Sequence, residues 1–207
     1  MIINVLGDSI TEGALASSED KTFVYVLANL LNCKVNNYGI SGSRIARQHV
    51  PSENPRYDLF FGSRVKDLVP SDFIIVFGGT NDYGHGDAPI GDILDETPDT
   101  FYGGMNYLID ELLKRYDRKE ILFMLPLYRF NEDDPLGDHV RENATLSLQG
   151  YRDCMIEVLN NRNIKYIDIK DIFGKPETCD LFGDGLHPND KGHKLIAELL
   201  AGYIKSL

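Results

Sequence analysis

The chain has 207 residues, of which 43% are hydrophobic and 26% are charged, as is typical of a folded domain with a substantial core. Its formal net charge of −11 argues against nucleic acids and anionic membrane surfaces as partners, because both attract clustered Lys and Arg. No apolar stretch approaches the roughly 20 residues that span a bilayer. The three cysteines are scattered and show no CxxC spacing, so neither a disulfide framework nor a zinc site is expected.

The first predicted element is a buried strand over residues 2–6. Because Met1 to Leu6 lacks a basic region, we read it as a strand rather than a signal peptide, and we expect a cytoplasmic location. Further short apolar runs predict strands at 34–37, 72–77, 120–125 and 165–169.

Helical patterns lie between these strands. Four apolar residues recur at helical spacing after the first strand: Phe23, Val26, Leu27 and Leu30. Further helices are expected at about 100–116 and 144–161, and the last one follows Pro188 with Asn189 as its N-cap. Strands alternating with helices predict a mostly parallel sheet of five strands, covered on both faces. No linker or repeat is visible, so we expect one domain over residues 1–207.

Two predicted loops are long, at about 83–98 and 127–143, and both are rich in Asp, Glu, Gly and Pro. Long loops in a compact domain are usually functional or mobile. Ligands of open α/β sheets bind beyond the carboxyl ends of the strands, where both loops begin. We therefore expect a site at this edge.

The first candidate for chemistry is Ser9, in the segment GDSIT at 7–11 directly after the first strand. Gly7 allows a tight turn, and the following residues lead towards a helix whose amino end favours negative charge. This position suits a nucleophile whose reaction forms an oxyanion. Taken alone, however, a serine that follows a strand is more often a helix cap.

Two glycine-containing segments could supply hydrogen-bond donors for such an oxyanion. Gly42 lies in SGS at 41–43, where the backbone is open to a ligand. Asn81 lies in GTND at 79–82 and offers a side-chain amide. Each segment alone is also typical of an ordinary turn or loop.

The fourth segment, DGLH at 184–187, places a carboxylate three residues before an imidazole. Asp184 can fold back to hold the His187 ring in one tautomer, so that the ring takes a proton from a hydroxyl. A surface turn, or half of a metal site, would show the same pattern; no further Cys or His stands at matching spacing, and we expect no metal.

Together the four segments provide all the parts that acyl transfer requires. The sequence resembles the SGNH (GDSL-type) hydrolase family of esterases and lipases, whose four blocks are matched in order by GDSIT, SGS, GTND and DGLH. The resemblance implies a flavodoxin-like three-layer α/β/α fold. It also implies a triad of Ser9, Asp184 and His187, with Ser9 N–H, Gly42 N–H and Asn81 as oxyanion donors. One departure is Ser43, where many relatives carry Asp.

No cofactor is expected, and the partner is a small-molecule ester; the oligomeric state is not predicted. The loops beside the site are polar and acidic, which favours short acyl groups on a sugar or another polar alcohol. Further candidates for substrate contact border the four segments: Asp8, Tyr83, His85, Tyr128, Arg129 and Phe130. Asp8 is also expected to organise its turn.

Other functions remain open from the sequence. Acyl transfer to an alcohol, or hydrolysis of longer acyl esters or thioesters, would use the same scaffold. A flavodoxin-like binding module without catalysis would need a phosphate cradle. No GxxxxGK[ST] is present, and Gly84-His85-Gly86 lacks the third glycine of GxGxxG because Pro89 occupies its place.

Overall fold

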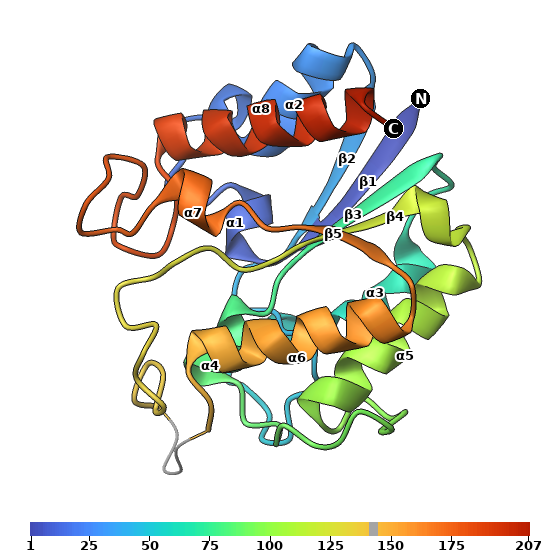
Figure 1. The fold of residues 1–207 in the computed structure, drawn as a ribbon, viewed down its shortest axis with the longest axis vertical. Coiled ribbons are helices and arrows are strands. Elements are labelled where there is room, and N and C mark those ends of the chain that lie inside the picture. Colours follow the sequence, from blue (N-terminus) through green and yellow to red (C-terminus); the bar gives the residue numbers. More distant parts are fainter. Residues whose placement is uncertain (141–144) are drawn as a thin grey trace.

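A computed structural model describes residues 1–140 and 145–207. Its centre is one parallel sheet with the strand order β2-β1-β3-β4-β5 (Figure 1). The strands are β1 (Ile2–Gly7), β2 (Lys34–Gly39), β3 (Phe73–Phe77), β4 (Ile121–Met124) and β5 (Lys165–Ile167). The predicted five-stranded sheet is confirmed, and its order is the one seen in flavodoxin-like folds.

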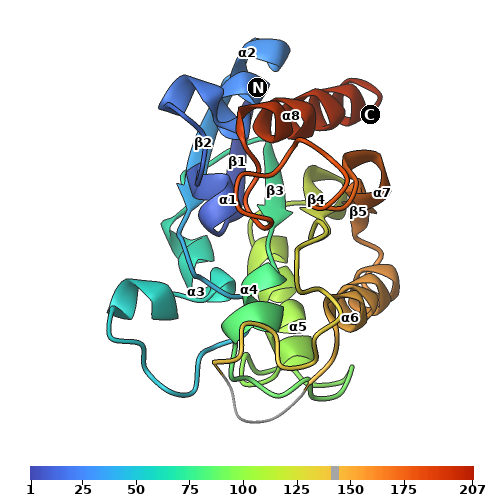
Figure 2. The same ribbon diagram turned by 90° about the vertical axis from the view of Figure 1, so that its left-hand side faces the viewer.

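Helices cover both faces of the sheet, which confirms the three-layer arrangement (Figures 1 and 2). One face carries α1 (Ser9–Glu12), α2 (Phe23–Leu31), α7 (Lys170–Phe173) and α8 (Asp190–Lys205). The other carries α3 (Phe61–Arg64), α4 (Thr80–His85), α5 (Phe101–Leu113) and α6 (Leu148–Asn161). In the described part of the chain, 3₁₀ turns join them: η1 (Glu19–Lys21), η2 (Pro55–Asp58), η3 (Val65–Asp67) and η4 (Arg118–Glu120).

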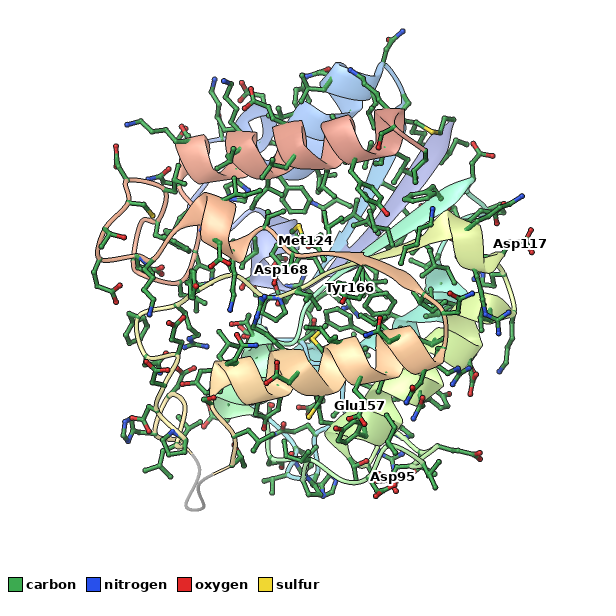
Figure 3. The ribbon with its side chains drawn as sticks, viewed as in Figure 1. Asp95, Asp117, Met124, Glu157, Tyr166 and Asp168 are labelled. Atoms are coloured by element: carbon green, nitrogen blue, oxygen red, sulfur yellow. The ribbon has the colours of Figure 1, made fainter. Side chains whose placement is uncertain are left out.

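The strands divide their side chains between two hydrophobic cores. In β1, Ile3 and Val5 face the core under α2 and α8, whereas Leu6 faces the core over α5 and α6. Successive strand residues point to opposite faces, and β3 is therefore apolar at every position because both faces are covered. Figure 3 shows side chains filling the space between the sheet and each helical layer.

The structure differs from the expected boundaries mainly near the candidate site. The expected loop at 83–98 begins inside α4, so Tyr83 is helical. Two expected boundaries lie outside the described residues: the start at 144 of the helix expected at 144–161, and the end at 143 of the second long loop. The corresponding helix, α6, begins at Leu148 with Ser147 as its N-cap. Strand five is shorter than expected because Ile169 precedes the start of α7.

The described helices also bear on membranes. Among residues 1–140 and 145–207, no helix is both long enough and apolar enough to pass through a bilayer.

The GDSIT segment at 7–11 is held by a close contact between α1 and the end of β2. A Cβ added at Gly39 would lie 2.0 Å from the backbone nitrogen of Glu12, which is far inside van der Waals contact. The amide of Asn37 donates to the Thr11 carbonyl at 2.8 Å. These contacts fix the short helix that begins at Ser9.

We predict that Gly39→Ala destabilises the fold by about 1–3 kcal/mol, because backbone must move to admit the methyl group. Gly202→Ala is the matched control, since nothing lies within 4 Å of a Cβ at Gly202 in α8. It should instead stabilise the helix by about 0.5–1 kcal/mol. Urea unfolding of both variants measures this, and equal midpoints would contradict the close contact.

Candidate active site

Ser9, His187 and Asp184 form one hydrogen-bonded relay. Ser9 is the first residue of α1, and its Oγ lies 3.0 Å from Nε2 of His187. Nδ1 of the same ring lies 2.7 Å from Oδ2 of Asp184. The hydroxyl near one end of the chain therefore meets the imidazole near the other end, with the carboxylate behind it.

The turn at 184–187 orients this carboxylate. Oδ1 of Asp184 accepts the N–H of Leu186 at 3.0 Å and the N–H of His187 at 2.7 Å. Gly185 has φ of +83°, a left-handed conformation that glycine adopts without a steric cost. Partial burial acts to raise the pKa of Asp184, but the hydrogen bonds from His187 and Leu186 outweigh it and hold the pKa below its usual range. The carboxylate stays ionised behind the ring.

Three hydrogen-bond donors lie on the segments that converge on Ser9. The Ser9 N–H is at a helix start, where N–H groups have no acceptor within the helix. Asn81 is buried at the start of α4, and its amide donates to the Ser43 carbonyl at 3.0 Å. An amide carries two N–H bonds, which leaves one for a further acceptor. Gly42, next to Ser43, has φ of +74°.

Arg64 holds these segments together, although it stands in no motif and is not among the candidate residues. Its buried guanidinium donates to Gly7 O at 2.9 Å, Tyr38 O at 2.8 Å and Ser43 Oγ at 3.1 Å. Burial lowers the pKa of Arg64 to about 10. One side chain therefore links the ends of β1 and β2 to the residue beside Gly42. Ser43, which departs from the family pattern, serves here as an acceptor for Arg64.

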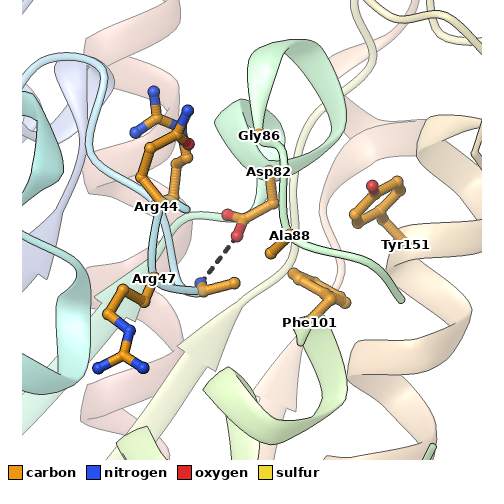
Figure 4. A pocket seen from close by; sticks show the side chains of 9 residues that line it. Arg44, Arg47, Asp82, Gly86, Ala88, Phe101 and Tyr151 are labelled. Carbon is orange, nitrogen blue, oxygen red and sulfur yellow. Dashed lines mark hydrogen bonds between the residues drawn. The ribbon is translucent and has the colours of Figure 1, made fainter. Parts of the chain in front are cut away.

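Asp82 holds the backbone that follows Ser43. Its carboxylate accepts the N–H groups of Ile45 and Ala46, both at 2.9 Å, and one of these two bonds is the dashed line at Asp82 in Figure 4. Burial raises the pKa of Asp82 to about 6, against the opposing effect of these two bonds. The last residue of the GTND segment thus fixes the backbone that follows Gly42 and Ser43.

Three of the residues expected to contact substrate are buried structural residues, which corrects that expectation. Asp8 caps α1 by accepting the Ile10 N–H at 3.0 Å. The Tyr83 hydroxyl donates to the carbonyls of Asn131 and Asp134 in the loop after β4. Arg129 pairs with Asp138 and donates to Thr80 O at 3.2 Å. Each of these side chains is at most 2% exposed and instead supports the loops around the site.

The other three candidates remain partly accessible. Phe130 is 59% exposed, and its backbone N–H donates to Gly185 O at 2.9 Å, which places it beside the turn at 184–187. The Tyr128 hydroxyl donates to Asp171 at 2.6 Å. His85 lies 3.5 Å from Asp138, which ties it to the loop that carries Arg129.

The burial of Asp8 has a consequence for stability. Burial is the largest influence on its pKa, which rises to about 6 although the Ile10 N–H and the charges of His187 and Arg64 lower it. A carboxyl whose pKa is raised by folding stabilises the protein below its unfolded pKa, and this contribution is lost as the pH rises through the folded pKa. For Asp8 the loss falls between about pH 4 and 7 and amounts to about 3 kcal/mol.

We therefore predict that Asp8→Asn is more stable than wild type at pH 7 and that the difference shrinks towards pH 4. Asparagine caps helices as well as aspartate does but cannot ionise. Urea unfolding of both proteins at several pH values between 4 and 7 measures the difference. A difference that stays constant over this range would show that folding does not raise the pKa of Asp8.

Known structures share this fold over the whole chain. A protein from Lactobacillus plantarum is 26% identical, with a TM-score of 0.79 over 99% of this chain and 96% of that one. A carbohydrate acetylesterase from Sinorhizobium meliloti is 15% identical, with a TM-score of 0.72 over 99% and 98% of the two chains. A possible lipase from Chitinophaga pinensis is 19% identical, with a TM-score of 0.69 over 99% and 98%.

No curated protein sequence matches the chain. The model of the GDSL-like lipase/acylhydrolase family, however, matches residues 5–195. This span includes all four segments that converge at the carboxyl edge of the sheet. The chain therefore belongs to the GDSL-like lipase/acylhydrolase family and is a hydrolase.

Proposed function

We propose that this hydrolase cleaves short-chain acyl esters of a polar alcohol, such as an acetylated sugar, through an acyl-enzyme formed on Ser9. The observation that carries the proposal is the relay from Ser9 Oγ to His187 at 3.0 Å and from His187 to Asp184 at 2.7 Å. A serine is a weak nucleophile unless a base accepts its proton, and this geometry supplies the base and its orienting carboxylate.

In the proposed reaction, His187 takes the Ser9 proton as Oγ attacks the ester carbonyl carbon. The tetrahedral oxyanion accepts hydrogen bonds from the N–H groups of Ser9 and Gly42 and from the Asn81 amide. The C–O bond to the alcohol then breaks, and the alcohol leaves with the proton from His187. Water repeats the sequence on the acyl-enzyme, which releases the acid and restores the serine.

The surroundings support a polar alcohol and a short acyl group. The loop after β4 carries Glu132, Asp133 and Asp134, and Lys175 pairs with Glu132 at 2.7 Å. A long acyl chain would need a continuous apolar groove instead. The fold is shared with a carbohydrate acetylesterase, which is in keeping with this choice. Acyl transfer to a second alcohol would use the same residues, and product analysis with a competing alcohol separates the two reactions.

We predict that Ser9→Ala lowers kcat on p-nitrophenyl acetate by roughly 10⁴-fold or more, as removal of a triad residue does. A serine-directed phosphonate should modify the wild-type protein and leave the variant untouched. Circular dichroism before the assay controls for folding. A variant that keeps a tenth of the activity would rule out Ser9 as the nucleophile.

Phe130 is the residue that we expect to border the leaving alcohol. In the proposed reaction His187 transfers its proton to this alcohol, so the alcohol lies on the side of the 184–187 turn. A Cβ added at Gly185 in this turn would lie 3.3 Å from the Phe130 ring, and the ring is exposed. The faces of aromatic rings pack well against apolar parts of a ligand.

We predict that Phe130→Ala lowers kcat/KM for an acetylated sugar about tenfold, equivalent to about 1.4 kcal/mol of lost contact. Ethyl acetate, which has no ring to contact Phe130, should be hydrolysed as before. Leu94→Ala is the control, because Leu94 is 83% exposed on the other long loop. Equal losses on both esters would show that the ring supports the turn rather than the alcohol.

A further inference from the structure

A second exposed aromatic ring borders the site, and no motif marks it. Tyr57 lies in η2, and a Cβ added at Gly42 would lie 3.5 Å from its Cδ1 and 3.6 Å from its Cγ. The ring therefore packs on the Cα of the glycine whose N–H is a proposed oxyanion donor. Tyr57 is nevertheless 39% exposed. One part of the ring rests on Gly42 while another part faces solvent.

The backbone on both sides of Tyr57 is firmly anchored to the site. Arg44, which is buried, donates to the Tyr57 carbonyl at 3.2 Å. Arg56 donates to Oε1 of Glu12 in α1 at 2.6 Å, and Oε2 of the same carboxylate accepts the Ser41 N–H at 2.8 Å. The neighbour of Tyr57 is thus tied both to the helix of Ser9 and to the residue before Gly42.

These hydrogen bonds indicate that the ring has a role in the site that requires a fixed position. An exposed aromatic ring gains little from burial in the protein itself, yet Arg44 bonds the Tyr57 carbonyl and the neighbouring Arg56 side chain bonds Glu12. Fixed aromatic rings beside reacting groups are common walls of small-molecule sites, because they give apolar contact with little loss of side-chain freedom.

The geometry of the reaction places Tyr57 on the acyl side. Around the carbonyl carbon, the oxyanion points to Gly42 and the alcohol points to His187, so the acyl group extends in the remaining direction. Tyr57 contacts Gly42, whereas Phe130 contacts Gly185 in the 184–187 turn, on the side of the leaving alcohol. The two rings therefore border different segments of the site, which leaves the acyl side rather than the alcohol side for Tyr57.

We propose that Tyr57 is a specificity-determining residue whose ring closes the acyl side of the site and restricts it to short acyl groups. This inference rests on the ester-hydrolase function proposed above. An acetyl group bound beside Gly42 ends short of the ring, whereas a long chain meets the ring. Removal of the ring makes room for the long acyl chain.

The test is the ratio of kcat/KM for p-nitrophenyl octanoate to that for p-nitrophenyl acetate. Tyr57→Ala should raise this ratio about tenfold or more, within the range by which pocket walls discriminate apolar groups. Tyr57→Phe should keep the wild-type ratio, because the ring rather than the hydroxyl forms the wall. Tyr25→Ala is the matched control, since Tyr25 in α2 is 46% exposed and lies in a different helix.

An unchanged or lowered ratio in Tyr57→Ala, with acetate hydrolysis still dependent on Ser9, overturns the role of Tyr57 and leaves the ester-hydrolase function intact. If the wild-type protein hydrolyses neither ester in a Ser9-dependent way, the proposed function itself is overturned. If Tyr57→Ala does not fold, Tyr57→Trp tests the same wall, because a larger ring should lower the ratio. A ratio in Tyr57→Trp at or above the wild-type value then overturns the proposal.

Discussion

The hydrogen bond between Ser9 Oγ and His187 Nε2 joins residues that are 178 positions apart, and the rest of the site is arranged around it. A hydroxyl and an imidazole pass a proton only at hydrogen-bond distance, so β1 and the turn before α8 must end at the same edge of the sheet. Parallel pairing of β1 between β2 and β3 puts the tip of β1 at this edge. The proposed oxyanion donors follow those two neighbouring strands.

Several ionisable groups around the relay are buried at a cost in stability. Asp8 and Asp82 both have a pKa raised to about 6 by burial, and Arg64 has one lowered to about 10. Their hydrogen bonds hold backbone rather than each other: the Ile10 N–H, the N–H groups of the loop after Ser43, and the carbonyl of Gly7. The charges fix loop geometry that apolar side chains could not specify, because only polar groups can bond backbone.

The sheet, the flanking layers and the four motif segments could be predicted from the sequence, because apolar runs and turn residues act locally. The roles of Tyr83 and Arg129 could not: both residues follow strands at the ligand edge, but packing between α4 and the loop after β4 buries them. Arg64 and Tyr57 stand in segments with no motif. Their positions depend on contacts with Gly7 and Gly42, which are distant in sequence, and a single sequence carries no record of such contacts.

The 178 positions between Ser9 and His187 also bear on how the protein is made. The ribosome makes Ser9 well before His187, and the five strands that the structure describes have all been translated by the time His187 is added. Until then the Ser9 hydroxyl lacks the His187 ring that it meets in the folded protein. The proposed relay therefore forms only after translation has passed residue 187 and the turn that precedes α8 has docked at the end of β1.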